Sequence, residues 1–287
     1  MIRLKMGGEP QVLREERRKR LPVALAAFNA HGTGTEELNV TLTGYQVAKV
    51  ILRERQHGKC ALCERAEDAF NQPVEHFRPK AASDDFDGTE WKPRVDSHYW
   101  WLTWTWSNLF FACDDCNRTG HKGNRFPIEA GQVRVAAPVR PLAKLSKAHF
   151  DVSNEPALMV NPRVDDHFDH LEWMPVDRTR PKKSWTWEIA ARSPRGKITI
   201  DAINLKYRTD EVNRHLRTLL NAWVAVDDAV KGKRWPDARR YWAGLIRTYL
   251  KDREQPFRNA AWWALDSLCP DGQRRQWKFA MLRKPIG

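Results

Sequence analysis

The sequence has no apolar run long enough to cross a membrane. Its most apolar stretch, residues 98–113, is 16 residues without a formal charge and contains Thr, Ser and Asn throughout. A membrane-spanning helix needs about 20 predominantly apolar residues, so this stretch is predicted to be a buried segment. Residues 1–10 also lack the apolar segment of a signal peptide. We therefore expect a cytoplasmic protein without a membrane partner.

Cysteine is scarce, with five among 287 residues. In a cytoplasmic protein so few cysteines are better explained as metal ligands or free thiols than as disulfides. Internal repeats and low-complexity tracts are also absent. With 41% hydrophobic and 30% charged residues, the chain is expected to fold as one large or two modest globular domains.

Acidic residues are too few to balance the basic ones. The chain has 49 Lys and Arg against 36 Asp and Glu, which gives a formal net charge of +13. Such a surplus favours an anionic partner, most commonly nucleic acid. A basic but otherwise ordinary soluble surface is the alternative.

Apolar periodicity predicts an α+β protein that is mainly α-helical. Helical spacing extends from Gly44 to Gln56, and Gly58 ends that helix. The C-terminal third predicts three more helices, the first with the apolar face Val212 to Trp223 and the next two opened by Pro236 and Pro256.

Other segments are less regular. The charged run from Arg14 to Arg20 predicts a solvated helix or arm. The alternation in Trp185 to Ile189 predicts a strand, and Arg195-Gly196 predicts a turn before residues 197–200. We divide the chain into an N-terminal arm and helix (1–58), a core with both cysteine pairs (59–130) and a mostly helical C-terminal region (131–287).

Four of the five cysteines form two CxxC pairs, Cys60 with Cys63 and Cys113 with Cys116. Two intervening residues let both thiolates of a pair reach one ion, and four thiolates complete a tetrahedral structural zinc site. A thioredoxin-like redox pair is the alternative, but it needs only one CxxC. Cys269 stands alone and is predicted to be a core thiol at a helix end.

Further motifs lie in register with the two cysteine pairs. They are Glu75-His76-x-x-Pro79, Asn108-Leu109, and Asn117 directly after the second pair. In this pattern the sequence resembles the HNH family of ββα-metal (His-Me finger) nucleases. Asparagine in the third position is the HNN variant, as in the HNH domain of RNA-guided CRISPR nucleases. The resemblance implies a zinc-stabilised ββα-metal HNH core with flanking N-terminal and C-terminal helices.

The chemistry of phosphodiester hydrolysis assigns roles to these residues. A histidine that is neutral near pH 7 can take the proton of the attacking water, so His76 is the expected general base. Glu75 and Asn117 offer hard oxygen ligands, which suit a catalytic Mg²⁺ or Mn²⁺. By family resemblance, Asn108 holds the loop that orients the histidine. Each of these residues taken alone could have a purely structural role. The nuclease interpretation depends on their order and spacing relative to the two cysteine pairs.

Basic residues flank the same motifs. We expect Arg78, Lys80, Lys122 and Arg125 to form a rim that binds the phosphates of nucleic acid, although ordinary surface charge is the alternative for each. His121 is a second candidate for metal ligand or base.

A narrower resemblance covers roughly residues 1–220. The chain is similar to the HNH nuclease subunit of Septu-type anti-phage defence systems and of related retron-associated systems. The matching motifs are KMGGEP (5–10), RQHG (55–58), VEHFRPK (74–80), YWWL (99–102), WSNL (106–109), KGxxFP (122–127), VNPRVDD (160–166), HL (170–171) and INL (203–205). One departure is that Arg118 to His121 separate the CxxCN motif from Lys122-Gly123, which usually follow it more closely.

This resemblance implies a DNA-cleaving effector that works with a separate ATPase of the SMC/ABC-like class. The tryptophan-rich C-terminal region is either the docking surface for that subunit or simply a core. Three other functions stay open: a stand-alone restriction or homing-type HNH endonuclease, an RNA-cleaving effector, and a zinc-dependent nucleic-acid-binding module without catalysis.

Overall fold

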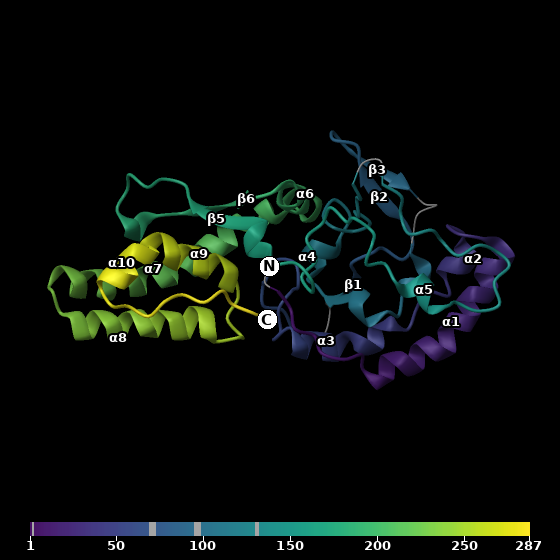
Figure 1. Ribbon diagram of the computed structural model, residues 1–287, viewed down its shortest axis with the longest axis horizontal. Helices are drawn as coiled ribbons and strands as arrows, with labels where there is room; N and C mark the ends of the chain where they lie inside the picture. Colours follow the sequence, from purple (N-terminus) through teal and green to yellow (C-terminus); the bar gives the residue numbers. More distant parts are fainter. Residues whose placement is uncertain (2, 69–72, 95–98, 130–131) are drawn as a thin grey trace.

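The computed structural model describes residues 1, 3–68, 73–94, 99–129 and 132–287. The molecule is elongated and has two lobes (Figure 1). One lobe contains the N-terminal helices and both cysteine pairs, and the other contains the C-terminal helices. Residues near the two ends of the chain lie side by side between the lobes, where Gly287 N donates to Arg3 O at 2.9 Å.

The N-terminal lobe begins with α1 (Gln11–His31), which includes the charged run predicted as a helix or arm. Gly32, with φ +89°, ends α1 in a conformation that disfavours residues with a side chain. Next come α2 (Glu36–Asn39), the 3₁₀ helix η1 (Tyr45–Ala48) and α3 (Lys49–Arg55). The helix predicted from Gly44 to Gln56 is therefore confirmed as η1 followed by α3.

Two small antiparallel sheets complete this lobe. β1 (Val74–His76) pairs with β4 (Leu109–Phe111), with His76 opposite Leu109. β2 (Ser83–Phe86) pairs with β3 (Trp91–Arg94), and α4 (Asp114–Asn117) follows β4. Short 3₁₀ helices, η3 (Trp100–Leu102) and η4 (Trp106–Asn108), lead into β4.

The apolar stretch 98–113 is buried where the structure describes it, apart from Thr105 and Ser107, as predicted. Trp100, Trp101 and Trp104 are among the largest fully buried side chains. Trp100 packs on Phe28 of α1 with ring centroids 4.8 Å apart. This stretch is therefore the apolar centre of the N-terminal lobe. In the described part of the chain, no helix combines the length and apolar character needed to span a bilayer.

A long connection joins the two lobes. It contains α5 (Lys147–Phe150) and the 3₁₀ helix η5 (His167–Asp169). Glu155 attaches it to the N-terminal lobe by accepting from Arg78 Nε at 2.6 Å and from Tyr99 Oη at 2.7 Å. A buried carboxylate thus fixes this connection to the N-terminal lobe.

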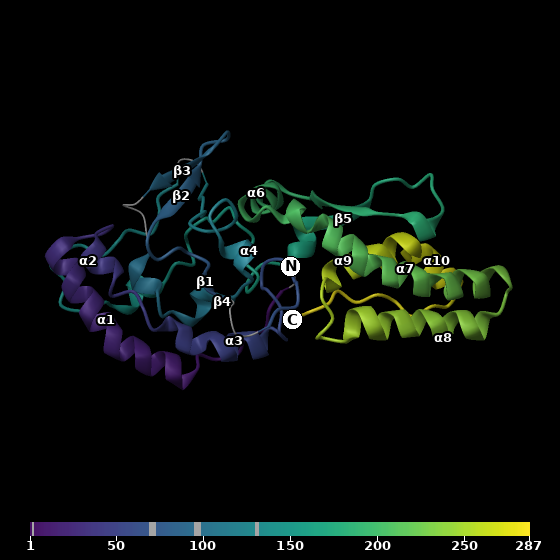
Figure 2. The same ribbon diagram turned by 180° about the vertical axis from the view of Figure 1, so that it is seen from behind.

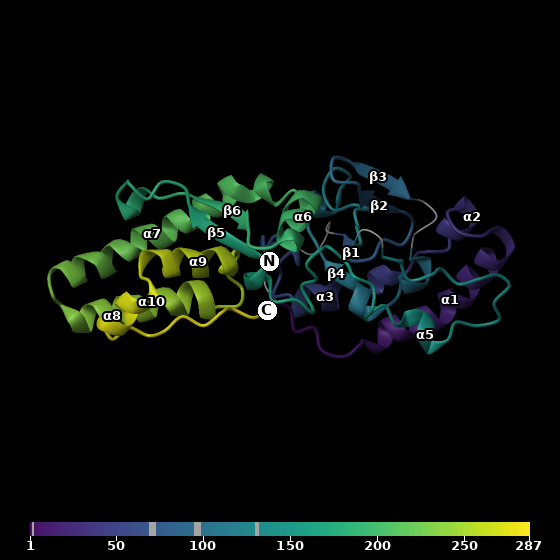
Figure 3. The ribbon, with the colours of Figure 1, turned by 45° about the horizontal axis from the view of Figure 1, so that its top comes forward.

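The second lobe is a helical layer against one hairpin (Figures 2 and 3). The hairpin pairs β5 (Leu171–Pro175) with β6 (Trp187–Ala191), and the short η6 (Lys182–Ser184) lies between them. The helices follow in chain order: α6 (Pro194–Ile203), η7 (Leu205–Arg208), α7 (Thr209–Lys231), α8 (Trp235–Ile246), the π-helical η8 (Arg247–Lys251), α9 (Arg258–Leu268) and α10 (Asp271–Gln276).

These elements confirm the strand near residues 185–189 and the three C-terminal helices. The mixed α+β class is confirmed as well. Trp223 of α7 and Trp242 of α8 pack edge to face with centroids 6.1 Å apart, so at least part of the tryptophan content is core. The region boundaries at residues 58 and 130 stay predictions.

The predicted turn at Arg195-Gly196 is wrong, because both residues lie in the first turn of α6. Ser193 caps this helix by accepting a hydrogen bond from Gly196 N at 3.0 Å, and Pro194 occupies the first helical turn. Glycine is needed at 196 for space: an added Cβ would lie 1.9 Å from His170 O. The serine and proline outweigh the turn tendency of the glycine.

Gly196→Ala is therefore expected to destabilise the protein by about 2–3 kcal/mol, because backbone must move to admit the methyl group. Urea unfolding would measure the change. Gly244→Ala is the matched control, since Gly244 lies in α8 with nothing within 4 Å of its added Cβ. That control should be stabilised by about 0.5–1 kcal/mol. Equal stability of the two variants would contradict this account of α6.

Candidate functional site

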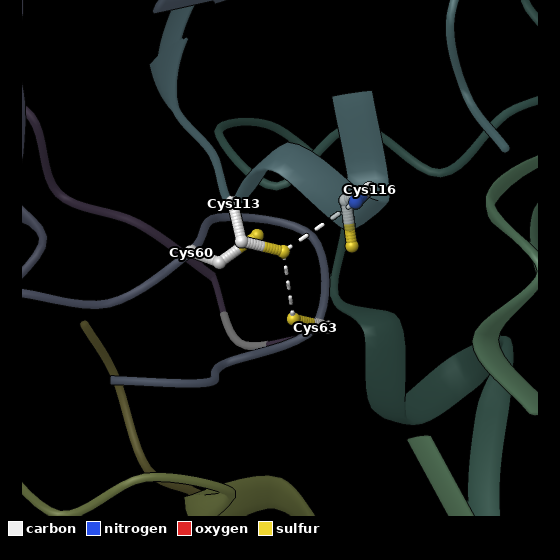
Figure 4. Close-up of side chains that lie close together, drawn as sticks. All are labelled: Cys60, Cys63, Cys113 and Cys116. Carbon is white, nitrogen blue, oxygen red and sulfur yellow. Dashed lines mark hydrogen bonds between the residues drawn. The ribbon is translucent and has the colours of Figure 1, made fainter. Parts of the chain in front are cut away.

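The four paired cysteines converge on one point (Figure 4). Their Sγ atoms all lie within 4.8 Å of one another, and Cys63 Sγ is 3.7 Å from Cys113 Sγ. Tetrahedral zinc with bonds of about 2.3 Å would hold its sulfur ligands about 3.8 Å apart. All four cysteines are buried and free of disulfides. This cluster could hold a metal ion such as zinc, as the CxxC spacing predicts, and Cys269 lies outside it, buried at the end of α9.

Hydrogen bonds to sulfur surround the cluster. Leu62 N donates to Cys60 Sγ and Cys116 N donates to Cys113 Sγ, each at 3.4 Å. The pKa of Cys113 is strongly lowered because the neighbouring thiols, Cys116 first, donate to its sulfur. Arg208 Nη2 lies 3.3 Å from the same sulfur. Amide and guanidinium donors of this kind stabilise thiolate ligands.

The first cysteine pair is joined to β4 through Gln56. The buried Gln56 amide donates to Phe111 O at 2.8 Å and accepts from Phe111 N at 2.9 Å. Ala61 N also donates to Phe111 O at 3.0 Å. The sulfur cluster and the β1–β4 pair are therefore one rigid unit, and β1 carries Glu75 and His76.

A pocket of about 380 Å³ opens beside this unit. It brings together four residues that the sequence predicts to act together: Glu75, His76, Lys80 and Asn117. Glu75 and His76 come from β1, and Asn117 is the last residue of α4. Residues from two separate motifs thus line one cavity.

His76 is held in a defined orientation. Its Nε2 lies 3.0 Å from Thr103 O, and a carbonyl oxygen can only accept, so Nε2 carries the proton. Nδ1 is then the ring atom that can take a proton. Burial lowers the pKa of His76 to about 3, and the nearby positive charge of Lys80 adds to this effect. The imidazole is therefore neutral at physiological pH.

Asn108 connects the two backbone segments that surround His76, at Arg78 and at Leu102. Its Oδ1 accepts from Arg78 N at 2.8 Å, and its Nδ2 donates to Arg78 O at 3.0 Å and to Leu102 O at 3.4 Å. One amide side chain thus joins the backbone after His76 to the backbone just before Thr103. This arrangement is what the loop-holding role of Asn108 requires.

Glu75 forms a buried ion pair with Lys122. Lys122 is fully buried, and its Nζ lies 2.6 Å from Glu75 Oε1. Burial raises the pKa of Glu75, while the charge of Lys122 opposes that rise. The ion pair engages Oε1, one of the two carboxylate oxygens. Lys122, expected at the phosphate rim, instead serves as the counter-ion of Glu75.

Two other expected rim residues are engaged elsewhere. Arg78 pairs with buried Glu155 at 2.6 Å, and Arg125 stacks over Trp91 and donates to Asp201 O at 3.2 Å. Neither lines the pocket, which leaves Lys80 as the rim cation that does.

His121, the second candidate for ligand or base, also lies apart from the pocket. Its Nε2 accepts from Arg118 Nη2 at 3.2 Å, and its ring packs against Tyr207.

The pocket also contains residues that sequence reasoning did not select. Tyr45, Gln46 and Lys49 come from η1 and α3, and Thr119 and Asn124 come from the loop after α4. The first three lie before the first cysteine pair, in the region assigned to an N-terminal arm. Their only sequence signal was helical spacing, which does not indicate that the helix faces the site.

The chain is similar to Septu protein PtuB of Bacillus mycoides (strain KBAB4). The two are 31% identical over 176 residues, which is 60% of this chain and 55% of that protein. The chain thus spans just over half the length of the curated relative that it matches. This similarity confirms the resemblance inferred from the motifs. No family model matches the chain, and no solved structure matches it.

Cys63→Ser is expected to abolish stoichiometric zinc binding, because it removes one of four thiolate ligands. The melting temperature should fall by at least about 10 °C, since structural zinc contributes directly to folding free energy. Metal analysis of the purified protein and thermal melting would measure both effects. Cys269→Ser is the control and should retain zinc. Retention of one zinc by the Cys63 variant would contradict the four-thiolate site.

Proposed function

We propose that this chain is a metal-dependent HNH endonuclease that hydrolyses phosphodiester bonds of nucleic acid, with DNA the favoured substrate. The observation that carries the proposal is the single pocket lined by Glu75, His76 and Asn117 beside four clustered cysteines. In this proposal the pair β1–β4 and the following α4 would supply the two strands and the helix of a ββα-metal core.

In this proposal His76 takes a proton from the attacking water at Nδ1, while Nε2–H stays bonded to Thr103 O. Asn108 keeps the loop that carries the histidine in place. Glu75 and Asn117 would hold Mg²⁺ or Mn²⁺, and their oxygen donors suit such hard ions. A divalent ion there would neutralise charge on the scissile phosphate and the leaving oxygen. Lys80 would bind phosphate at the rim.

The biological setting follows from similarity. We infer that the chain is the effector subunit of a Septu-type anti-phage defence system, coupled to an SMC/ABC-like ATPase, because its relative is named a Septu protein. Retron-associated systems with such a subunit are a variant of this setting. A stand-alone HNH endonuclease, an RNA-cleaving effector and a zinc-dependent binding module without cleavage are the alternatives.

A basic stripe on the second lobe supports a nucleic-acid substrate. Between Asp237 and Asp252 the chain has no acidic residue. Arg239, Arg247 and Lys251 are exposed there and form no ion pair within the described ranges. Exposed cations that form no ion pair attract phosphate backbones more than apolar partners.

His76→Ala is expected to lower the cleavage rate by about 10²–10⁴-fold, the usual contribution of a general base. The cleavage rate would be measured on labelled plasmid DNA and on total RNA in the presence of Mg²⁺, with and without the ATPase subunit. The comparison would also identify the substrate. His121→Ala is the matched control, because it removes a histidine that does not line the pocket, and it should cut at close to the wild-type rate. Undiminished cleavage by the His76 variant would rule out the proposed site. Binding without any cleavage would favour the zinc-dependent binding module.

Replacing Arg239, Arg247 and Lys251 by glutamine should weaken binding of a DNA duplex about tenfold. The slope of log affinity against log salt should fall by about 2–3, because three phosphate contacts are lost. Fluorescence anisotropy at several salt concentrations, in the His76→Ala background, would measure both.

The control replaces Arg178, Arg180 and Lys183 by glutamine. These residues are in and beside the β5–β6 connection, on the edge of the same lobe opposite α8 (Figure 1), and the net charge changes equally. This control should bind nearly as tightly as the parent. Equal losses in the two triple variants would show a general charge effect and not a stripe.

A further inference from the structure

Tyr45 makes direct contact with the proposed general base. The Tyr45 and His76 rings meet edge to face, with centroids 4.5 Å apart and an interplanar angle of 74°. Both line the pocket that also contains Glu75 and Asn117. Lys80 Nζ lies 5.5 Å from the centroid of the same Tyr45 ring. Tyr45 thus lies between the histidine and the one expected rim cation that lines the pocket.

The turn before Tyr45 is anchored from two sides. Arg20 Nη1 of α1 donates to Thr43 Oγ1 at 2.7 Å, and Trp104 Nε1 donates to Thr43 O at 2.9 Å. Gly44, with φ +84°, then turns the chain into η1, and an added Cβ there would lie 2.3 Å from Glu16 Oε1. The start of η1 therefore has a fixed position relative to α1 and to the buried tryptophan segment.

The same tryptophan segment holds His76. Thr103 O accepts from His76 Nε2, and the next residue, Trp104, holds the turn that presents Tyr45. One hydrogen bond at Nε2 leaves the imidazole free to tilt about that bond. An aromatic side chain packed edge to face against the ring removes this freedom.

We propose that Tyr45 is a positioning residue whose ring holds the His76 imidazole with Nδ1 available to the attacking water. The inference rests on the proposed nuclease function. It also makes the N-terminal segment, from α1 to η1, a necessary part of the site. The ring and not the hydroxyl carries this role, because the ring makes the contact with the imidazole. Burial, and then Glu75, raise the pKa of Tyr45, so the phenol stays protonated and uncharged.

The test compares Tyr45→Ala, Tyr45→Leu and Tyr45→Phe in the complete chain, with its ATPase if cleavage needs it. Tyr45→Ala and Tyr45→Leu should lower kcat about 30- to 100-fold, since small misplacements of a catalytic group cost rates of this order. Their KM and zinc content should stay within twofold of wild type. Tyr45→Phe should restore kcat to within threefold. Val47→Ala, on the exposed side of the same 3₁₀ helix, is the control and should match wild type.

An independent measurement uses ¹⁵N NMR of the His76 ring. Wild type and Tyr45→Phe should show sharp ring signals of the Nε2–H tautomer. Tyr45→Leu should keep that tautomer, because Thr103 O still accepts from Nε2, but its ring signals should shift and broaden as the imidazole tilts. Unchanged kcat in the Leu variant, a Phe variant as slow as the Ala variant, or a change in KM alone would each overturn the inference. If His76→Ala cleaves as fast as wild type, the proposed function fails instead, and the NMR comparison still decides whether Tyr45 orients the ring.

Discussion

The convergence of four cysteine sulfurs is the constraint on which this structure depends. It joins residues 60–63 to residues 113–116, which are separated by about fifty residues of chain, and so closes the loop that contains β1. Closing such a loop costs conformational entropy, and the strands between the cysteine pairs are three or four residues long. Sheets this short are not stable alone. A metal held by the four thiolates would supply the missing stability.

The second lobe attaches to the same place. Arg208 donates to Cys113 Sγ and forms an ion pair with Asp115 at 2.6 Å, and Lys59 Nζ donates to carbonyl oxygens of the loop before α9, including Gln255 O at 3.2 Å. Glu64 Oε2 accepts from Asn259 N at 3.2 Å. The C-terminal helices are thus held by charged groups around the cysteines.

The pocket combines burial with fixed charges of both signs. His76 is neutral because burial and the nearby charge of Lys80 lower its pKa. Glu75 forms an ion pair with the buried ammonium of Lys122. Glu75, His76 and Lys122 are buried and Lys80 is partly buried, so their charges act in a region of low dielectric and affect one another strongly. Asn108 and Thr103 set the geometry without adding charge. The polar groups of the site are therefore prearranged before any substrate enters.

Elements whose chemistry is local follow directly from the order of residues along the chain. Two-residue spacing determines that each cysteine pair can share an ion, and apolar periodicity determines the helices near residues 212 and 236. Contacts between residues far apart in the sequence become known only from the folded structure. Lys122 pairs with Glu75 because folding buries the two side chains together, and Tyr45 reaches His76 because Arg20 and Trp104 hold the turn before it. Spacing along the chain specifies which groups can act together locally, whereas burial and charge neutralisation depend on which surfaces pack together.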